Sequence, residues 1–331
     1  MRWLSAVVLV LGAGIACSDG SAPAAGEPER LSAAGLYQDM AERILAPGSI
    51  ELEPRHQLWS DGAVKRRFLQ LPPGGRIDTS DMEHWRFPVG TRVWKEFSQD
   101  GALLETRLIE RTGPGDGDTW MGAFVWLPDA SDAIFRPDGA PDINGTQHDA
   151  PPAKQCPACH GGEPGRILGL SAVQLRGEGR GVRLQELADR GLLSHAPAPD
   201  LPSAAPGSPV AAAALGYLHA NCGHCHSRGG LAFRDTDLVL RLSAGDRAVE
   251  ATGAARTAVG VMMQKRLAGS GGLRIQPGSP ETSGVLARMG TRSGADPAAQ
   301  MPPLATERID EQGIAAVTEW IRSLPADHPP R

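Results

Sequence analysis

The sequence has few cysteines, few aromatic residues and no excess of positive charge, and each scarcity narrows what the protein can be. Its 331 residues include five cysteines, and aromatic residues make up 5%. The net charge is −5 and no basic patch is evident, so nucleic acid is not an expected partner. Residues 3–16 form the one long apolar run. That run is too short to span a bilayer, so no spanning helix is expected.

Four of the five cysteines fall in two short motifs of the same form. Residues 156–160 read Cys-Pro-Ala-Cys-His, and residues 222–226 read Cys-Gly-His-Cys-His. In the attachment signature of a c-type haem, two cysteines form thioethers to the porphyrin and the histidine ligates the iron. The sequence therefore predicts two covalent haem c groups with iron. Their attachment residues are Cys156, Cys159 and His160 for the first, and Cys222, Cys225 and His226 for the second.

Two other chemistries remain open for these cysteine pairs. Two Cys-x-x-Cys pairs can hold a tetrahedral zinc ion. The Cys-Pro-Ala-Cys sequence also has the form of a redox-active dithiol. Neither alternative explains why a histidine follows both pairs, so haem is the favoured interpretation.

The fifth cysteine, Cys17, ends the N-terminal apolar run. The segment Gly14-Ile15-Ala16-Cys17 resembles the cleavage site of a bacterial lipoprotein signal, in which the cysteine is lipidated. An ordinary cleaved signal is the alternative. Both imply export, which haem attachment also requires. We expect a protein of the periplasm or cell envelope with a lipid anchor at Cys17, and Ser18 favours the outer membrane.

The remaining sequence indicates two unlike domains. Short runs rich in aromatic and β-branched residues at 85–90, 91–97, 103–111 and 119–127 predict an antiparallel sheet, with a hairpin turn at 98–101. Helical spacing predicts helices at 33–45, from Pro209 to Cys222, and at 310–324. The expected parts are a signal peptide (1–17), a tether (18–30), a β-rich haem domain (31–195), a linker (196–209) and a cytochrome c-like domain (210–331).

The spacing of the motifs supports an α+β fold class. Only 66 positions separate Cys156 from Cys222, too few for a helical cytochrome domain after the first motif. We therefore expect the first haem to be covered by the β-rich segment before it. The second is expected in an all-α, cytochrome c-like domain that follows.

Two resemblances accompany these motifs. The segment Phe87-Pro-Val-Gly-Thr91, then Lys95-Glu96, then residues 119–126 before a late haem motif, resembles the cytochrome c′-beta sandwiches. Members of that group bind nitric oxide or oxidise hydroxylamine, often at five-coordinate haem. The segments at 58–67, 71–74 and 217–222 resemble a family of exported bacterial di-haem cytochromes, a likeness that implies haem and export but no substrate.

The distal iron ligands are less evident than the proximal histidines. Met301, in a Met-Pro-Pro segment before the closing helix, resembles the distal methionine of class I cytochromes c. The alternatives are Met289, Met262, Met263 or a packing role for Met301. For the first haem the candidates are His148, His195, His219 or an open sixth position.

The leading functional hypothesis is electron transfer to or from a redox partner protein in the periplasm or at the cell surface. A haem enzyme or gas-binding protein for nitric oxide, hydroxylamine or peroxide is the alternative, with an open iron site at the first haem. A third possibility is a binding module centred on the unusual segment Leu-Trp-Ser-Asp-Gly-Ala at 58–63. A buried tryptophan beside an Asp-Gly turn is the favoured interpretation of that segment.

Overall fold

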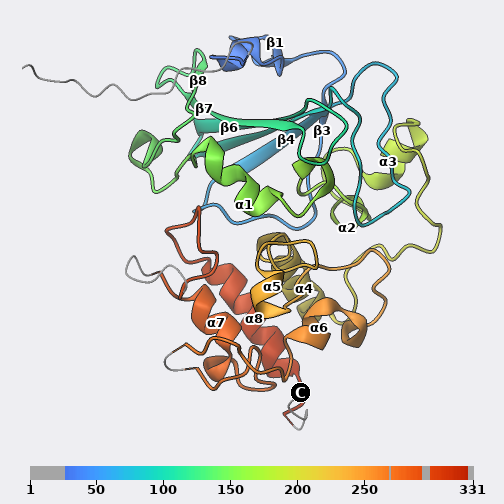
Figure 1. Cartoon of the computed structure of the whole chain (residues 1–331), viewed down its shortest axis with the longest axis vertical. Coiled ribbons are helices and arrows are strands. Elements are labelled where there is room, and N and C mark those ends of the chain that lie inside the picture. Colours follow the sequence, from blue (N-terminus) through green and yellow to red (C-terminus); the bar gives the residue numbers. More distant parts are fainter. Residues whose placement is uncertain (1–26, 268–269, 293–298, 327–331) are drawn as a thin grey trace, which may run out of the picture.

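The computed structural model describes residues 27–267, 270–292 and 299–326, and Figure 1 shows a β-rich half above a helical half. The predicted signal peptide, most of the tether and the lipidation site Cys17 lie outside the described residues. The coarse prediction of mixed α and β structure with antiparallel sheets is confirmed. None of the helices described is long and apolar enough to cross a membrane.

The β-rich half contains a six-stranded sheet whose strands follow one another in chain order, all antiparallel. The strands are β3 (Ile50–Glu51), β4 (Val64–Gln70), β5 (Arg92–Gln99), β6 (Ala102–Arg111), β7 (Thr119–Trp126) and β8 (Ala133–Phe135). The predicted turn between β5 and β6 is confirmed. Asp100 and Gly101 both have positive φ (50° and 83°), as a two-residue hairpin turn requires.

Two local predictions in this half are wrong. Residues 33–45 form the short strands β1 (Tyr37–Asp39) and β2 (Ile44–Leu45) instead of a helix. Gly35 and Arg43 have positive φ, which interrupts a right-handed helix, and Leu36 and Tyr37 are buried against the sheet. The run at 85–90 forms no strand, although Arg86 makes an isolated bridge to Asp78. Pro88 has no backbone N–H to donate there.

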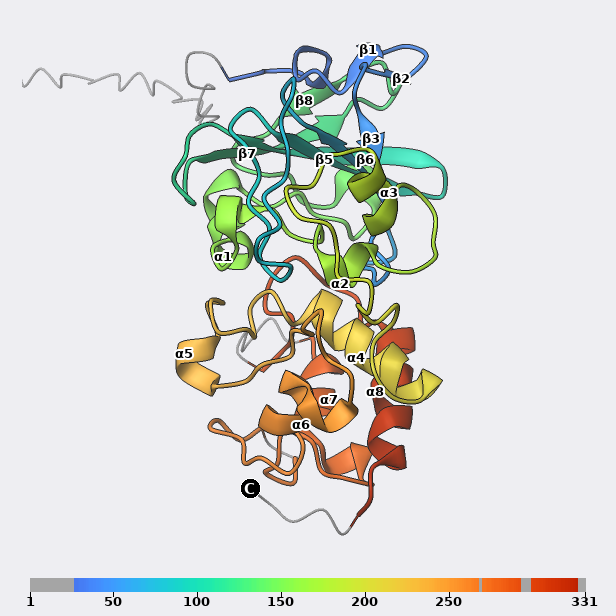
Figure 2. The same ribbon diagram turned by 90° about the vertical axis from the view of Figure 1, so that its right-hand side faces the viewer.

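The two faces of the sheet have different coverings. Phe68, Trp94 and Leu108 lie opposite one another on β4, β5 and β6 and are buried with Leu31 and Leu36 of the N-terminal segment. The other face is turned toward the short helix α1 (Cys156–His160) and the helical half (Figure 1 and Figure 2). The first Cys-x-x-Cys-His motif therefore lies between the sheet and the second half.

The helical half contains helices joined by long irregular segments. The predicted helices α4 (Pro209–Asn221) and α8 (Glu311–Ser323) are confirmed, with Ser208 and Asp310 as side-chain N-caps. The expectation of a wholly α-helical second domain stays a prediction. The remaining helices of the described chain are α2 (Ala172–Leu175), α3 (Leu184–Asp189), α5 (Phe233–Thr236), α6 (Gly253–Thr257) and α7 (Gly284–Met289), with 3₁₀ turns at η1 (Leu31–Ala33), η2 (Ile143–Gly145), η3 (Ala153–Gln155), η4 (Pro164–Arg166), η5 (Val249–Ala251) and η6 (Pro280–Thr282).

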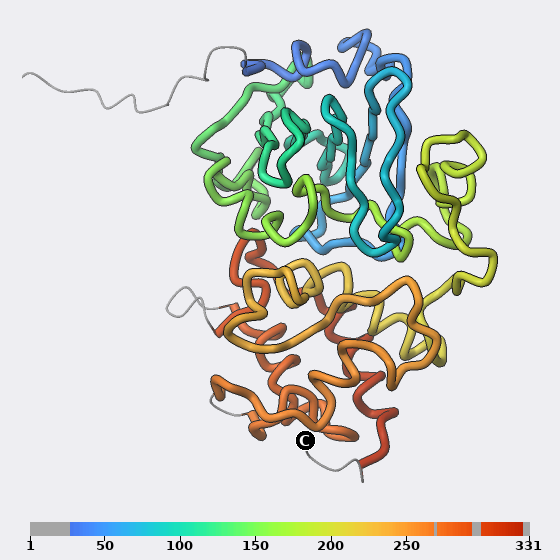
Figure 3. The backbone as a smooth tube through the Cα atoms, turned by 45° about the vertical axis from the view of Figure 1, so that its right-hand side comes forward, coloured from blue at the N-terminus to red at the C-terminus, as the bar shows by residue number. Residues whose placement is uncertain are grey.

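One hydrophobic core joins the two halves. It includes Leu69 of the sheet, Leu187 of α3, Leu215 of α4 and Val317 of α8. The segment at 196–209 passes along one side of the molecule from one half to the other (Figure 3). Within it, Ala205 is buried in the same core. The Pro/Ala-rich segment is thus packed against the rest of the chain.

Helices α4 and α8 approach most closely where Gly313 faces the ring of Tyr217. A Cβ at position 313 would lie 2.1 Å from Tyr217 Cζ. Such a separation is far shorter than a van der Waals contact, so only glycine allows this crossing.

We predict that Gly313→Ala destabilises the protein by about 1–3 kcal/mol, the usual cost of overpacking a core. The free energy of unfolding from urea titration measures the effect. Gly245→Ala is the control, because no atom lies within 4 Å of a Cβ there. Equal stability of both variants and the parent would contradict the close crossing.

Candidate functional site

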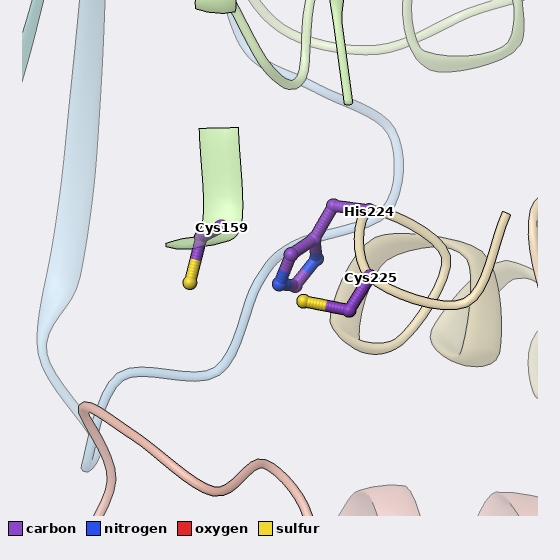
Figure 4. Close-up of side chains that lie close together, drawn as sticks. All are labelled: Cys159, His224 and Cys225. Atoms are coloured by element: carbon purple, nitrogen blue, oxygen red, sulfur yellow. The ribbon is translucent and has the colours of Figure 1, made fainter. Parts of the chain in front are cut away.

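The two Cys-x-x-Cys-His motifs meet where the halves of the molecule touch. Cys159 of α1 faces His224 and Cys225, which follow α4 (Figure 4). The Sγ and ring nitrogen atoms of these three residues lie within 4.8 Å of one another. A Cβ at Gly162 would lie 2.9 Å from the carbonyl oxygen of Gly229, so the backbones after the motifs also touch. This adjacency was not predicted from the sequence.

The four motif cysteines are free thiols in different electrostatic surroundings. Hydrogen bonds from the Cys225 thiol and then from His224 lower the pKa of Cys159, while the bond to Cys159 raises the pKa of Cys225. Burial raises the pKa of Cys222 to about 12. Cys159 is therefore the thiol best able to ionise. His224 is half-buried against this pair.

The imidazole of His160 is held in the orientation that a metal ligand needs. Its Nδ1 atom lies 2.7 Å from the backbone carbonyl oxygen of Arg166, in η4. A carbonyl can only accept, so Nδ1 carries the proton and Nε2 keeps its lone pair. Burial lowers the pKa of His160 to about 4, which leaves the ring neutral at neutral pH.

His226 is arranged in the same way by a side chain. Its Nδ1 atom lies 3.4 Å from Oγ1 of Thr236, in α5, and that hydroxyl donates its own proton to the carbonyl oxygen of Ala232. The Thr236 oxygen therefore accepts from Nδ1–H, and Nε2 is again the nitrogen with a free lone pair. Burial lowers the pKa of His226 to about 4. Arg166 and Thr236 are positioning residues that could not be selected from the sequence.

The predicted distal ligand Met301 lies beside the second motif. Met301, Cys222, Met289 and Trp59 line one cavity. Met262 is 45% exposed, and Met263 accepts a hydrogen bond from Ser270. Of the four candidate methionines, Met301 and Met289 line this cavity together with Cys222 of the second motif. Iron ligation by Met301 stays a prediction.

The histidines considered for the first haem all have other partners. His148 is buried, and its Nε2 atom lies 2.8 Å from a carboxylate oxygen of Glu105. His219 accepts a hydrogen bond at Nδ1 from the backbone N–H of Leu242. His195 bonds through Nδ1 to Ser194. The structure brings none of the three into the group formed by Cys159, His224 and Cys225.

The unusual segment at 58–63 holds the halves together. One carboxylate oxygen of Asp61 accepts hydrogen bonds from the backbone N–H groups of Glu307 and Arg308, at 3.0 and 2.8 Å. Trp59 donates from its ring nitrogen to the carbonyl oxygen of Arg308. Its backbone N–H donates to the side chain of Asn221, the residue before Cys222. The segment therefore makes an internal contact that positions the second motif and the segment after Met301.

The residues of both motifs have the donor chemistry that covalent haem requires. Each motif offers two free thiols and one neutral imidazole whose Nδ1 atom is already engaged. Beside Cys222 of the second motif, Met289 and Met301 line a small cavity. In this respect the residues fit haem c.

Comparisons with known proteins found no matching family model, no matching curated protein and no matching solved structure.

We predict that Asp61→Ala lowers the free energy of unfolding by about 2 kcal/mol or more, because two charge-assisted hydrogen bonds are lost. Asp61→Asn keeps an acceptor oxygen and tolerates the positive φ of 51° at this position, so it should cost less. Urea unfolding of the two variants and the parent measures the difference. If Asp61→Ala is as stable as the parent, the contact does not hold the halves together.

Proposed function

We propose that the protein is an exported di-haem c-type cytochrome that transfers electrons. The observation that carries this proposal is the preparation of both motif histidines, each with Nδ1 tied to an acceptor and Nε2 left as the ligand nitrogen. A proximal iron ligand needs one ring nitrogen engaged through its proton and the other left free, and both motif histidines meet that need. The meeting of the two motifs adds support, because it would bring two redox centres close together in one chain.

Under this proposal each half has one role in haem binding. Cys156, Cys159 and His160 hold one haem beneath a β-rich domain, and the second motif holds the other in a cytochrome c-like helical domain. Met301 is the proposed sixth ligand of the second iron. When bound, haem supplies reversible one-electron chemistry, and the chain sets the ligands, the burial and the distance between the centres. Export, the lipid anchor at Cys17 and a redox partner outside the cytoplasm belong to the same proposal.

A metal centre built from Cys159, His224 and Cys225 is the second candidate function. Their ligand atoms already lie within 4.8 Å of one another, and thiolate with imidazole is a donor set typical of zinc. This centre and the two thioether attachments exclude each other, since Cys159 and Cys225 cannot serve both. Metal and haem content of the same sample therefore decides between them.

We predict two haems per chain when the protein is exported in a cell that matures c-type cytochromes. Replacing Cys156 and Cys159 together with alanine should leave one haem, and so should replacing Cys222 and Cys225, because each pair serves one group. Alkaline pyridine spectra and elemental analysis measure haem and metal. One zinc ion per chain without haem would reject the cytochrome proposal in favour of the metal centre.

We also predict that Met301→His lowers the midpoint potential of one haem and leaves the other unchanged, because a thioether ligand favours ferrous iron. Spectroelectrochemical titration measures both potentials. Met262→His is the control, since Met262 is largely exposed. A shift produced by Met289→His but not by Met301→His would transfer the assignment to Met289.

A further inference from the structure

Three positively charged residues lie side by side on the face of the sheet that is turned toward the first motif. Strand register places Arg67 opposite Lys95, and Lys95 opposite Arg107. Directly opposite side chains of neighbouring strands point to the same face, about 5 Å apart. We call Arg67, Lys95 and Arg107 the cation row. Like charges in these positions destabilise a sheet unless an anion lies between them.

The protein itself provides little compensating charge on this face. Glu105 lies in the neighbouring row, opposite Phe97, and is fully buried. Its Oε1 atom is bound by Arg107 and by His148, and its Oε2 atom is buried without a hydrogen-bond partner. That neighbouring row also contains another cation, Lys65, whose ammonium group donates to the carbonyl oxygen of Leu58. The face therefore has more positive than negative charge.

Two members of the cation row lack an anionic partner among the described residues. Arg67 is 7% exposed, and its Nη1 atom is buried without a hydrogen-bond partner. The ammonium group of Lys95 lies 4.8 Å above the ring of Phe97, a contact that satisfies none of its N–H groups. Burial lowers the pKa of Lys95, and Arg67 lowers it further. Arg67 is buried and Lys95 is half-buried. A buried cation such as Arg67 is costly unless a ligand pairs with it.

The cation row lies next to the first motif. The charge of Lys95 acts on His160, and the charge of Arg107 acts on Cys156. Figure 1 shows α1 below the sheet, on the side of the helical half. Beside the second motif, Arg274 and Arg288 act on His226, but neither lies on a strand and they form no such row in the described part of the chain. The two motifs therefore differ in electrostatic surroundings as well as in covering.

We propose that the cation row binds a carboxylate or a small oxyanion beside the first motif. Guanidinium and ammonium groups in one row are suited to planar or tetrahedral oxygen anions. The anion has two candidate sources: the propionate groups of a haem held at His160, or a free oxyanion such as nitrite or phosphate. The first source rests on the proposed function, whereas the second does not.

The test uses the full-length protein as purified, with Lys95→Met to remove the charge, Lys95→Arg to keep it, and Lys154→Gln as control. Lys154 is an exposed cation two positions before Cys156. Calorimetric titration with sodium phosphate and with sodium nitrite measures anion binding. Redox titration measures the midpoint potential of each haem.

If propionates occupy the row, neither anion binds, and Lys95→Met lowers the potential of one haem while Lys95→Arg and Lys154→Gln do not. If a free anion is the ligand, phosphate or nitrite binds, and Lys95→Met weakens binding about tenfold or more, the loss expected for one charge-assisted hydrogen bond. Absence of anion binding together with unchanged potentials in Lys95→Met overturns the proposal. If the purified sample contains no haem, the cytochrome proposal fails. Calorimetry alone then tests whether the cation row binds an anion, so the two failures are distinguished.

Discussion

The contact between the β-rich half and the helical half is the constraint on which the rest of the structure depends. Asp61 and Trp59 bind the backbone at Glu307 and Arg308, and Asn221 links the same segment to the end of α4. These bonds join positions that are between 162 and 249 residues apart in the chain. Nearer the motifs, Glu163 after α1 pairs with Arg241 of the helical half, and Cys159 lies beside His224 and Cys225.

The two motifs differ in the environment that each half provides. The first lies on a sheet face with a row of cations, and its histidine is fixed by a backbone carbonyl. The second lies at the end of a helix beside a cavity with two methionines, and its histidine is fixed by a threonine hydroxyl. Under the proposed function these differences would give the two haems unequal potentials. Charge near the first centre and the proposed thioether ligation at the second would be the physical sources of that inequality.

Local features of the fold were predictable because local chemistry decides them. Asp100-Gly101 permits two positive φ angles, and Ser208 and Asp310 cap helices, so the β5–β6 turn and helices α4 and α8 follow from the sequence. The helical prediction at 33–45 was wrong because burial of Leu36 and Tyr37 against the sheet outweighs periodic spacing. The two Cys-x-x-Cys-His motifs were found from spacing alone, and their role in haem attachment stays a prediction. Their adjacency was not, since it depends on bonds between distant segments. The cation row was missed because strand register, and not any one strand, places its residues opposite one another.

The most direct test of the central claim is the intact mass of the exported protein after denaturation, with free thiols counted on the same sample. The account predicts a mass increase of two haem groups that survives denaturation, and no reactive thiol at Cys156, Cys159, Cys222 or Cys225. An unmodified mass with four reactive thiols at these positions would contradict it.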